Sequence, residues 1–228
     1  MNSFLLFLLA GSGLFGLISL ARFSLNLGFV DRPIVIALLF ALVTSNWQEP
    51  IAIGIFFECF WLDTFPAGTY LPPQQTFAAF LSLLTVQYLG LTQVGSILPL
   101  LILALPLTWL MNQLESWIRK SENVNYLRSW EQAHSEAEAY RPGIFVWWSL
   151  LKTAALNMAA FGCFFSLAVF CLRLGLQFWP ASVPGLSWGH VLTGSLAAGL
   201  LSLRSRRVYQ ALVGAALCLI LVLALAGA

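Results

Sequence analysis

A single glutamate, Glu58, lies deep within an apolar run of this 228-residue chain, flanked by residues 55–57 and 59–62. A charged side chain at the centre of a bilayer costs roughly 3 kcal/mol on insertion scales, so it persists where it faces a polar cavity or pairs with another group. We therefore expect Glu58 to face a cavity that holds a substrate. The alternative is that Glu58 accepts hydrogen bonds from neighbouring helices and fixes their packing.

A second carboxylate, Asp63, follows five residues later, about 140° around a continuous helix. The two carboxylates would share a face only if the helix breaks near Leu62, and the Thr64-Phe65-Pro66 sequence favours such a break. Two roles therefore stay open for Asp63: a supporting role in the site, or a helix cap at the membrane interface.

The sequence from Pro72 to Thr76 has the pattern of a helix start, where proline is tolerated in the first turn. Gln74 and Gln75 then fall beside backbone N–H groups that have no partner within the helix. Amide side chains in that position suit a neutral ligand rich in hydroxyl groups, such as a sugar, although an interfacial helix cap would have the same pattern. We expect direct hydrogen bonds to sugar hydroxyls from Glu58 and Gln74. Supporting positions are expected for Asp63, Thr69 and Gln75.

No set of residues with catalytic spacing accompanies these groups. His134 lies among glutamates in a hydrophilic stretch and His190 lies at the start of an apolar one, and neither has the spacing of a metal ligand. The four cysteines are all in apolar stretches without metal or redox spacing, where cysteine usually acts as a small hydrophobe. We expect a non-catalytic protein that needs neither a metal nor a cofactor.

The composition places the chain among membrane proteins. Hydrophobic residues make up 60% and charged residues only 9%, whereas a soluble domain carries roughly 25% charged residues. The formal net charge of +2 is too small and too dispersed to favour nucleic acid. We predict an all-α polytopic membrane protein that forms one membrane domain over residues 1–228, with about five to seven spans.

The apolar segments differ in length. Two consecutive segments, Pro33–Thr44 and Ile51–Leu62, have about a dozen residues each, where a straight span needs about 20. A polar break with a proline, residues 45–50, separates them. Such pairs indicate a broken or re-entrant hairpin, which survives in lipid only where protein or a water-filled cavity covers it. We expect this broken hairpin to cover residues 33–75. The other expected apolar segments are Phe4–Leu20, Thr76–Leu89, Val94–Met111, Ile144–Leu174, Leu186–Leu203 and Val208–Leu225.

The longest hydrophilic segment, about 114–141, reads as a surface helix. Its basic residues, among them Arg119, Lys120 and Arg128, place it in the cytoplasm by the positive-inside rule. The first apolar segment has no basic region before it, so we interpret it as a retained span rather than a signal peptide.

The stretch from Asp31 to Ala79 carries a family pattern. It has Asp31-Arg32-Pro33, an apolar run, a polar break, an Ile/Gly-rich segment with the embedded Glu58, and a glycine turn at Gly68 before the helix start at Pro73. This pattern resembles the membrane component IIC of the mannose/fructose/sorbose family of sugar phosphotransferase systems. Where that family usually has an acidic residue after the helix-start proline, this chain has Gln74.

The resemblance implies a sugar permease subunit of a bacterial inner membrane, dependent on phosphoenolpyruvate. Its partners would be a IID membrane subunit, with which it would form an oligomer of IIC–IID units, and soluble IIA and IIB carriers of the phosphoryl group. The chain itself would hold a hexose and supply no phosphorylated residue. Two alternatives stay open: an ion- or proton-coupled transporter in which Glu58 and Asp63 titrate, and a diverged regulatory or structural subunit without transport.

Overall fold

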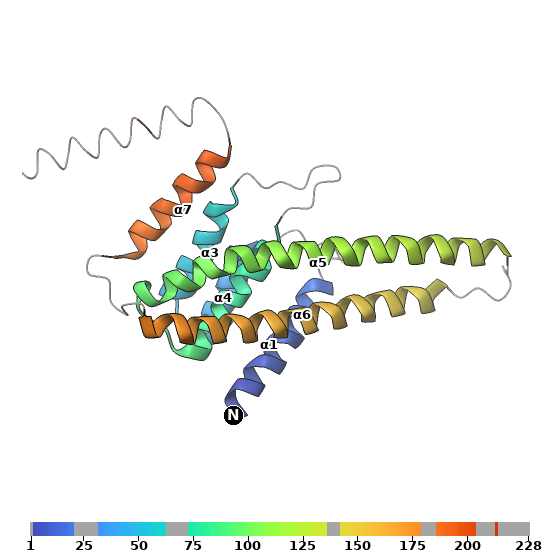
Figure 1. The fold of residues 1–228 in the computed structure, drawn as a ribbon, viewed down its shortest axis with the longest axis horizontal. Coiled ribbons are helices and arrows are strands. Elements are labelled where there is room, and N and C mark those ends of the chain that lie inside the picture. The colour runs from blue at the N-terminus through green and yellow to red at the C-terminus, as the bar shows by residue number, and fades with distance from the viewer. Residues whose placement is uncertain are drawn as a thin grey trace, which may run out of the picture.

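The computed structural model describes residues 2–20, 32–62, 73–135, 142–178, 186–203 and 213. These residues form helices and contain no strand, which confirms the all-α class (Figure 1). The helices are α1 (Asn2–Leu20), α2 (Pro33–Thr44), α3 (Gln48–Phe60), α4 (Gln75–Leu89), α5 (Val94–Ser135), α6 (Pro142–Phe178) and α7 (Trp188–Ser202).

Helix α4 lies at the centre of the fold. It contacts α1, α2, α3, α5 and α6, and every residue from Thr76 to Val86 is buried. Phe77 and Phe80 of α4 meet Phe161 of α6 at ring-centroid distances of 6.0 and 5.2 Å, and Phe15 of α1 lies 4.8 Å from Phe161. Aromatic pairs in these arrangements contribute about 0.5–1.5 kcal/mol each beyond their area burial. The start of α4 is thereby fixed against the surrounding helices.

Helices α2 and α3 form the expected pair of short segments. They are separate helices that pack against each other, and the chain turns between them through Ser45, whose φ of 55° is in the left-handed region. With 12 and 13 residues, each is about 18–20 Å long, well short of a bilayer core of about 30 Å. Gly54 lets the pair approach closely, because a Cβ there would lie only 2.5 Å from the Cβ of Ala37.

The far end of α3 is covered by α7. Gly199 of α7 lies so close to α3 that a Cβ at this position would overlap the carbonyl oxygen of Cys59. At its start, α7 has a capping box in which the Ser187 side chain and the His190 ring each bond the other's backbone. Helix α7 therefore backs the turn of α3 that carries Glu58.

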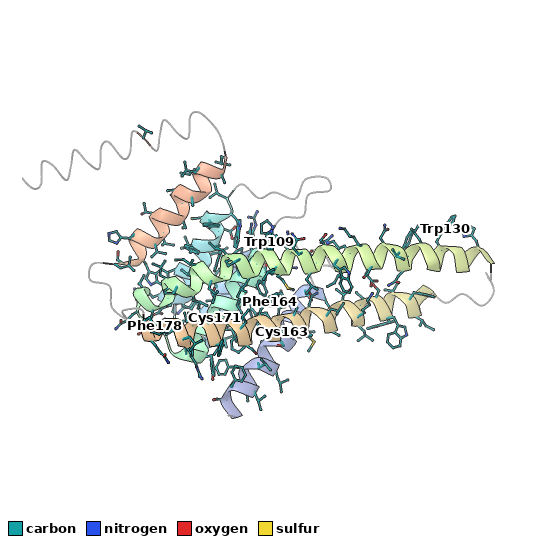
Figure 2. All side chains as sticks on the ribbon, in the orientation of Figure 1. Trp109, Trp130, Cys163, Phe164, Cys171 and Phe178 are labelled. Carbon is teal, nitrogen blue, oxygen red and sulfur yellow. The ribbon has the colours of Figure 1, made fainter. Side chains whose placement is uncertain are left out.

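Helices α5 and α6 are far longer than expected for single spans. Their 42 and 37 residues correspond to about 63 and 55 Å, and the two extend side by side beyond the other helices (Figure 1). Trp130 lies near the outer end of α5, while Phe178 ends α6 at the opposite end of the pair (Figure 2). The Lys152 ammonium group, 2.8 Å from the Glu122 carboxylate, ties the extended part together.

The expected span Val94–Met111 and most of the expected hydrophilic helix at about 114–141 belong to one helix. Helix α5 continues without interruption through Pro99 and Pro106 to Ser135. From residue 107 to residue 141 the chain contains neither glycine nor proline, and glutamate, lysine and arginine are good helix formers, so a rise in charge does not end the helix.

Within the described residues, three helical segments are long and apolar enough to cross a membrane: Ser3–Leu20, Val94–Leu127 and Gly143–Phe178. Two shorter helices, α2 and α4, are also apolar. Together they make the chain a multi-pass helical membrane protein.

Candidate functional site

Glu58 lies in the last turn of α3 and pairs with a cation from the start of α2. The guanidinium Nη1 of Arg32 is 2.9 Å from Oε1 of Glu58, and the two side chains are 52% and 29% exposed. The second carboxylate oxygen, Oε2, is buried and has no hydrogen-bond partner among the described residues. Arg32 therefore compensates the charge and fixes one oxygen, while the other remains an acceptor.

Both readings of Glu58 find support in this geometry. The bond to Arg32 joins the start of α2 to the end of α3, as a packing role requires. A buried oxygen without a partner is uncommon in proteins, and this one can accept a hydrogen bond from a further group, as the substrate-binding interpretation requires. The arrangement leaves a negatively charged acceptor beside a fixed cation.

Gln74, which immediately precedes α4, is only 4% exposed. Its amide nitrogen donates a hydrogen bond to Oε2 of Glu115 in α5. Arg119, one turn further along α5, donates to the other oxygen of Glu115 from Nε and Nη2, at 3.1 and 2.6 Å. Hydrogen bonds to a charged group are about twice as strong as neutral ones. The start of α4 is thus anchored to α5 through a buried, compensated carboxylate.

Glu115 was missed in the sequence because it opens the hydrophilic segment. The structure buries it to 1% exposure. A signal was present in its spacing: Met111, Glu115 and Ile118 recur at helical intervals of four and three, and all three are buried. A charged residue on an otherwise apolar stripe, with arginine four residues on, is a candidate for a buried pair.

Gln75 points to a different helix from Gln74. Its amide nitrogen lies 3.5 Å from the carbonyl oxygen of Trp61, just beyond the end of α3. The two adjacent glutamines therefore tie the start of α4 to α3 and to α5. Glu58 lies three residues before Trp61 in the sequence, and its side chain contacts Arg32 rather than either glutamine. Three of the five predicted site residues, Glu58, Gln74 and Gln75, are thus described. Asp63 and Thr69 lie outside the described residues.

The described parts of the chain offer hydrogen-bonding groups rather than a metal centre. No group of three or more histidine, cysteine, aspartate or glutamate side chains that could hold a metal occurs there. His134 is exposed and its Nδ1 lies 2.9 Å from the carbonyl of Trp130, one turn back in the same helix. Carboxylates and amides in a buried setting can bind hydroxyl groups as acceptors and donors.

Comparison with known proteins gives one family and one fold. The family model described as the sorbose-specific IIC component of the PTS (phosphotransferase system) matches residues 4–178. No curated protein matches the sequence. A solved structure described as "Structure of membrane protein" aligns with a TM-score of 0.55 and 16% identity, covering 95% of this chain and 87% of that chain. That likeness shows the fold alone.

Proposed function

Since the chain belongs to the family of sorbose-specific IIC components of the sugar phosphotransferase system, we propose that it binds a hexose and carries it inward across the bacterial inner membrane together with a IID subunit. The IIC components are the membrane permease subunits of these systems. The resemblance seen between Asp31 and Ala79 is thereby confirmed, and the family match covers most of the chain.

The observation that carries the proposal is the second oxygen of Glu58. It is buried and has no partner among the described residues, while Arg32 holds the first oxygen. A sugar hydroxyl that donates to this oxygen would form a charge-assisted bond, worth about 1.5–3 kcal/mol. The same bond would satisfy an acceptor that is costly to leave buried and unpaired.

The start of α4 supplies the rest of the proposed site. Gln74 joins the start of α4 to α5 and Gln75 joins it to the residue after α3, and amide side chains are of the type that both donates hydrogen bonds to sugar hydroxyls and accepts them. Asp63 and Thr69, in the segment that joins α3 to α4 in sequence, are proposed as supporting groups. All of these groups suit a neutral polyol.

In this proposal the chain acts as a binding and translocating subunit. Soluble IIA and IIB components carry the phosphoryl group, and the sugar is phosphorylated as it is released. This chain supplies no phosphorylated residue, and the IIC–IID unit assembles into an oligomer. The hydrophilic segment from about 114 to 141 faces the cytoplasm.

The test is sugar uptake by vesicles from cells that express the chain with a candidate IID subunit. Purified soluble carriers and phosphoenolpyruvate are supplied, and the phosphorylation state of the internal sugar is measured. We expect phosphorylated hexose inside wild-type vesicles and none with Glu58→Leu, although this variant inserts normally. Normal uptake by well-inserted Glu58→Leu would refute the site.

Glu49→Leu is the matched control. Glu49 lies at the other end of α3 and also has one buried oxygen without a partner among the described residues. If both variants lose uptake equally, the loss reflects a general effect on α3 rather than a sugar contact. Unmodified sugar that accumulates with the proton gradient would instead indicate an ion-coupled transporter, and no product from any hexose would indicate a subunit without transport.

A further inference from the structure

Asn157 of α6 carries a deeply buried amide that the site described so far does not use. It is 1% exposed, and both its amide nitrogen and its amide oxygen lack a hydrogen-bond partner within the described residues. An amide offers donors and an acceptor, and burial without partners is destabilising. The amide of Asn157 can therefore pair with a bound group that both accepts and donates hydrogen bonds.

Contacts between α5 and α6 set the level of Asn157 along the helices. The two run antiparallel, and Glu122 of α5 bonds Ser149 and Lys152 of α6. Glu115 lies seven residues before Glu122 on α5, about 10 Å along the helix axis. On α6, which runs the other way, the same distance counted forward from Ser149 and Lys152 reaches residues 156–159. Asn157 is thus level with Glu115.

Contacts between α4 and α6 independently place Asn157 at the level of Gln74 along the helices. Phe161 of α6, one turn beyond Asn157, meets Phe77 of α4 at 6.0 Å, and Phe77 lies three residues beyond Gln74. The two helices run in the same direction. Near the end of α4, the Tyr88 hydroxyl accepts a hydrogen bond from Arg173, which lies further along α6 than Phe161. One turn back along each helix leads to Asn157 and to Gln74.

We propose that Asn157 is a sugar-binding residue whose amide takes one hydroxyl of the hexose as both donor and acceptor, beside the Gln74–Glu115 pair. We call Gln74, Glu115 and Asn157 the polar layer. This inference rests on the proposed function and adds α6 to the site. Arg119 already compensates the charge of Glu115, so the layer fits a neutral hydroxyl better than an ion.

The test uses the vesicle assay with the hexose that wild type transports and the set of its monodeoxy analogues as competitors. One analogue lacks the hydroxyl that Asn157 contacts, and we expect wild type to bind it about 10- to 100-fold more weakly than the parent sugar. Asn157→Leu, which is close in size, should bind the parent sugar weaker by the same factor. It should no longer distinguish that analogue from the parent.

Thermal unfolding separates this role from a structural one. Asn157→Leu removes two buried polar atoms that lack partners, so the purified variant should unfold at the same temperature as wild type or higher. A structural role would lower that temperature without altering discrimination between analogues. Ser82→Ala is the control. Ser82 is fully buried and its hydroxyl has no hydrogen-bond partner in the described part of the chain, but it lies eight residues along α4 from Gln74, about 12 Å away. It should leave discrimination unchanged.

The outcomes distinguish this inference from the proposed function. If wild type transports a hexose and Asn157→Leu still discriminates against every analogue as wild type does, the role of Asn157 is refuted and the permease function stands. If wild type takes up no hexose, both are refuted. Loss of discrimination against a single analogue, with stability retained, supports both.

Discussion

Replacing Gln74 with glutamate tests whether the start of α4 depends on a donor at this position. Gln74 is buried and its amide donates to the buried carboxylate of Glu115. Gln74→Glu keeps the size of the side chain but replaces the donor with a second negative charge. It also places an acidic residue at the position where the family usually has one. We expect the variant to be destabilised at neutral pH.

The size of the loss follows from the geometry. Two unit charges about 3 Å apart repel by roughly 5–6 kcal/mol at an effective dielectric constant of about 20, and Arg119 offsets part of this. Proton uptake by the new carboxyl group sets an upper limit, because protonating a glutamate side chain of ordinary pKa, about 4.3, at pH 7 costs about 3.7 kcal/mol. A protonated carboxyl group can then donate as the amide did. The expected loss is therefore close to this limit, about 3.7 kcal/mol at pH 7.

The loss of stability in Gln74→Glu should decrease as the pH is lowered. Because the new carboxyl group of the variant must bind a proton in the folded state, the loss of stability should shrink by about 1.4 kcal/mol for each pH unit lowered from 7 towards 5. Thermal unfolding of wild type and Gln74→Glu in detergent at pH 5, 6 and 7 measures this. Adding Glu115→Gln restores a donor opposite the new carboxylate and should recover most of the stability at pH 7. Equal stability of Gln74→Glu and wild type at pH 7 would refute the reasoning.

Two glycine substitutions test the close helix contacts. Gly199→Ala should destabilise the protein by about 1–3 kcal/mol, because the new methyl group overlaps the backbone carbonyl of Cys59; Gly194→Ala, in open space on the same helix, should stabilise it by up to about 1 kcal/mol. Gly54→Ala should be destabilising by a similar 1–3 kcal/mol and should lower sugar uptake, since it forces α3 away from Ala37. Thermal unfolding in detergent measures each, and a stabilised Gly199→Ala or Gly54→Ala would contradict the packing described.

The helices themselves could be predicted closely from apolar runs and from the residues that stop helices. The segment Pro33–Thr44 matches α2 at both ends, since Pro33 sets the start and a polar turn follows Thr44. The expected segment Thr76–Leu89 differs from α4 by one residue. The end of α5 could not be predicted in this way, because hydropathy falls near residue 112 while helix propensity does not.

The site could be predicted only in part. Glu58 and the two glutamines stand out locally, as a carboxylate in an apolar run and as amides at a helix start. The partner of Gln74 lies 41 residues away and the partner of Glu58 lies 26 residues away. Such pairings depend on how helices pack, and neither periodicity nor spacing within one segment contains that information. Whether these residues bind a sugar stays a prediction.

The length of α5 has a mechanical consequence. Glu115 lies near the middle of this helix, with 20 residues beyond it up to Ser135, or about 30 Å. If the helix pivots as a stiff rod at the Gln74 contact, a tilt of about 10° moves the far end by roughly 5 Å over that length. A rearrangement at the start of α4 that is too small to detect there is therefore amplified several-fold near Trp130. A spectroscopic label at this exposed position would report the motion of the buried junction from a distance.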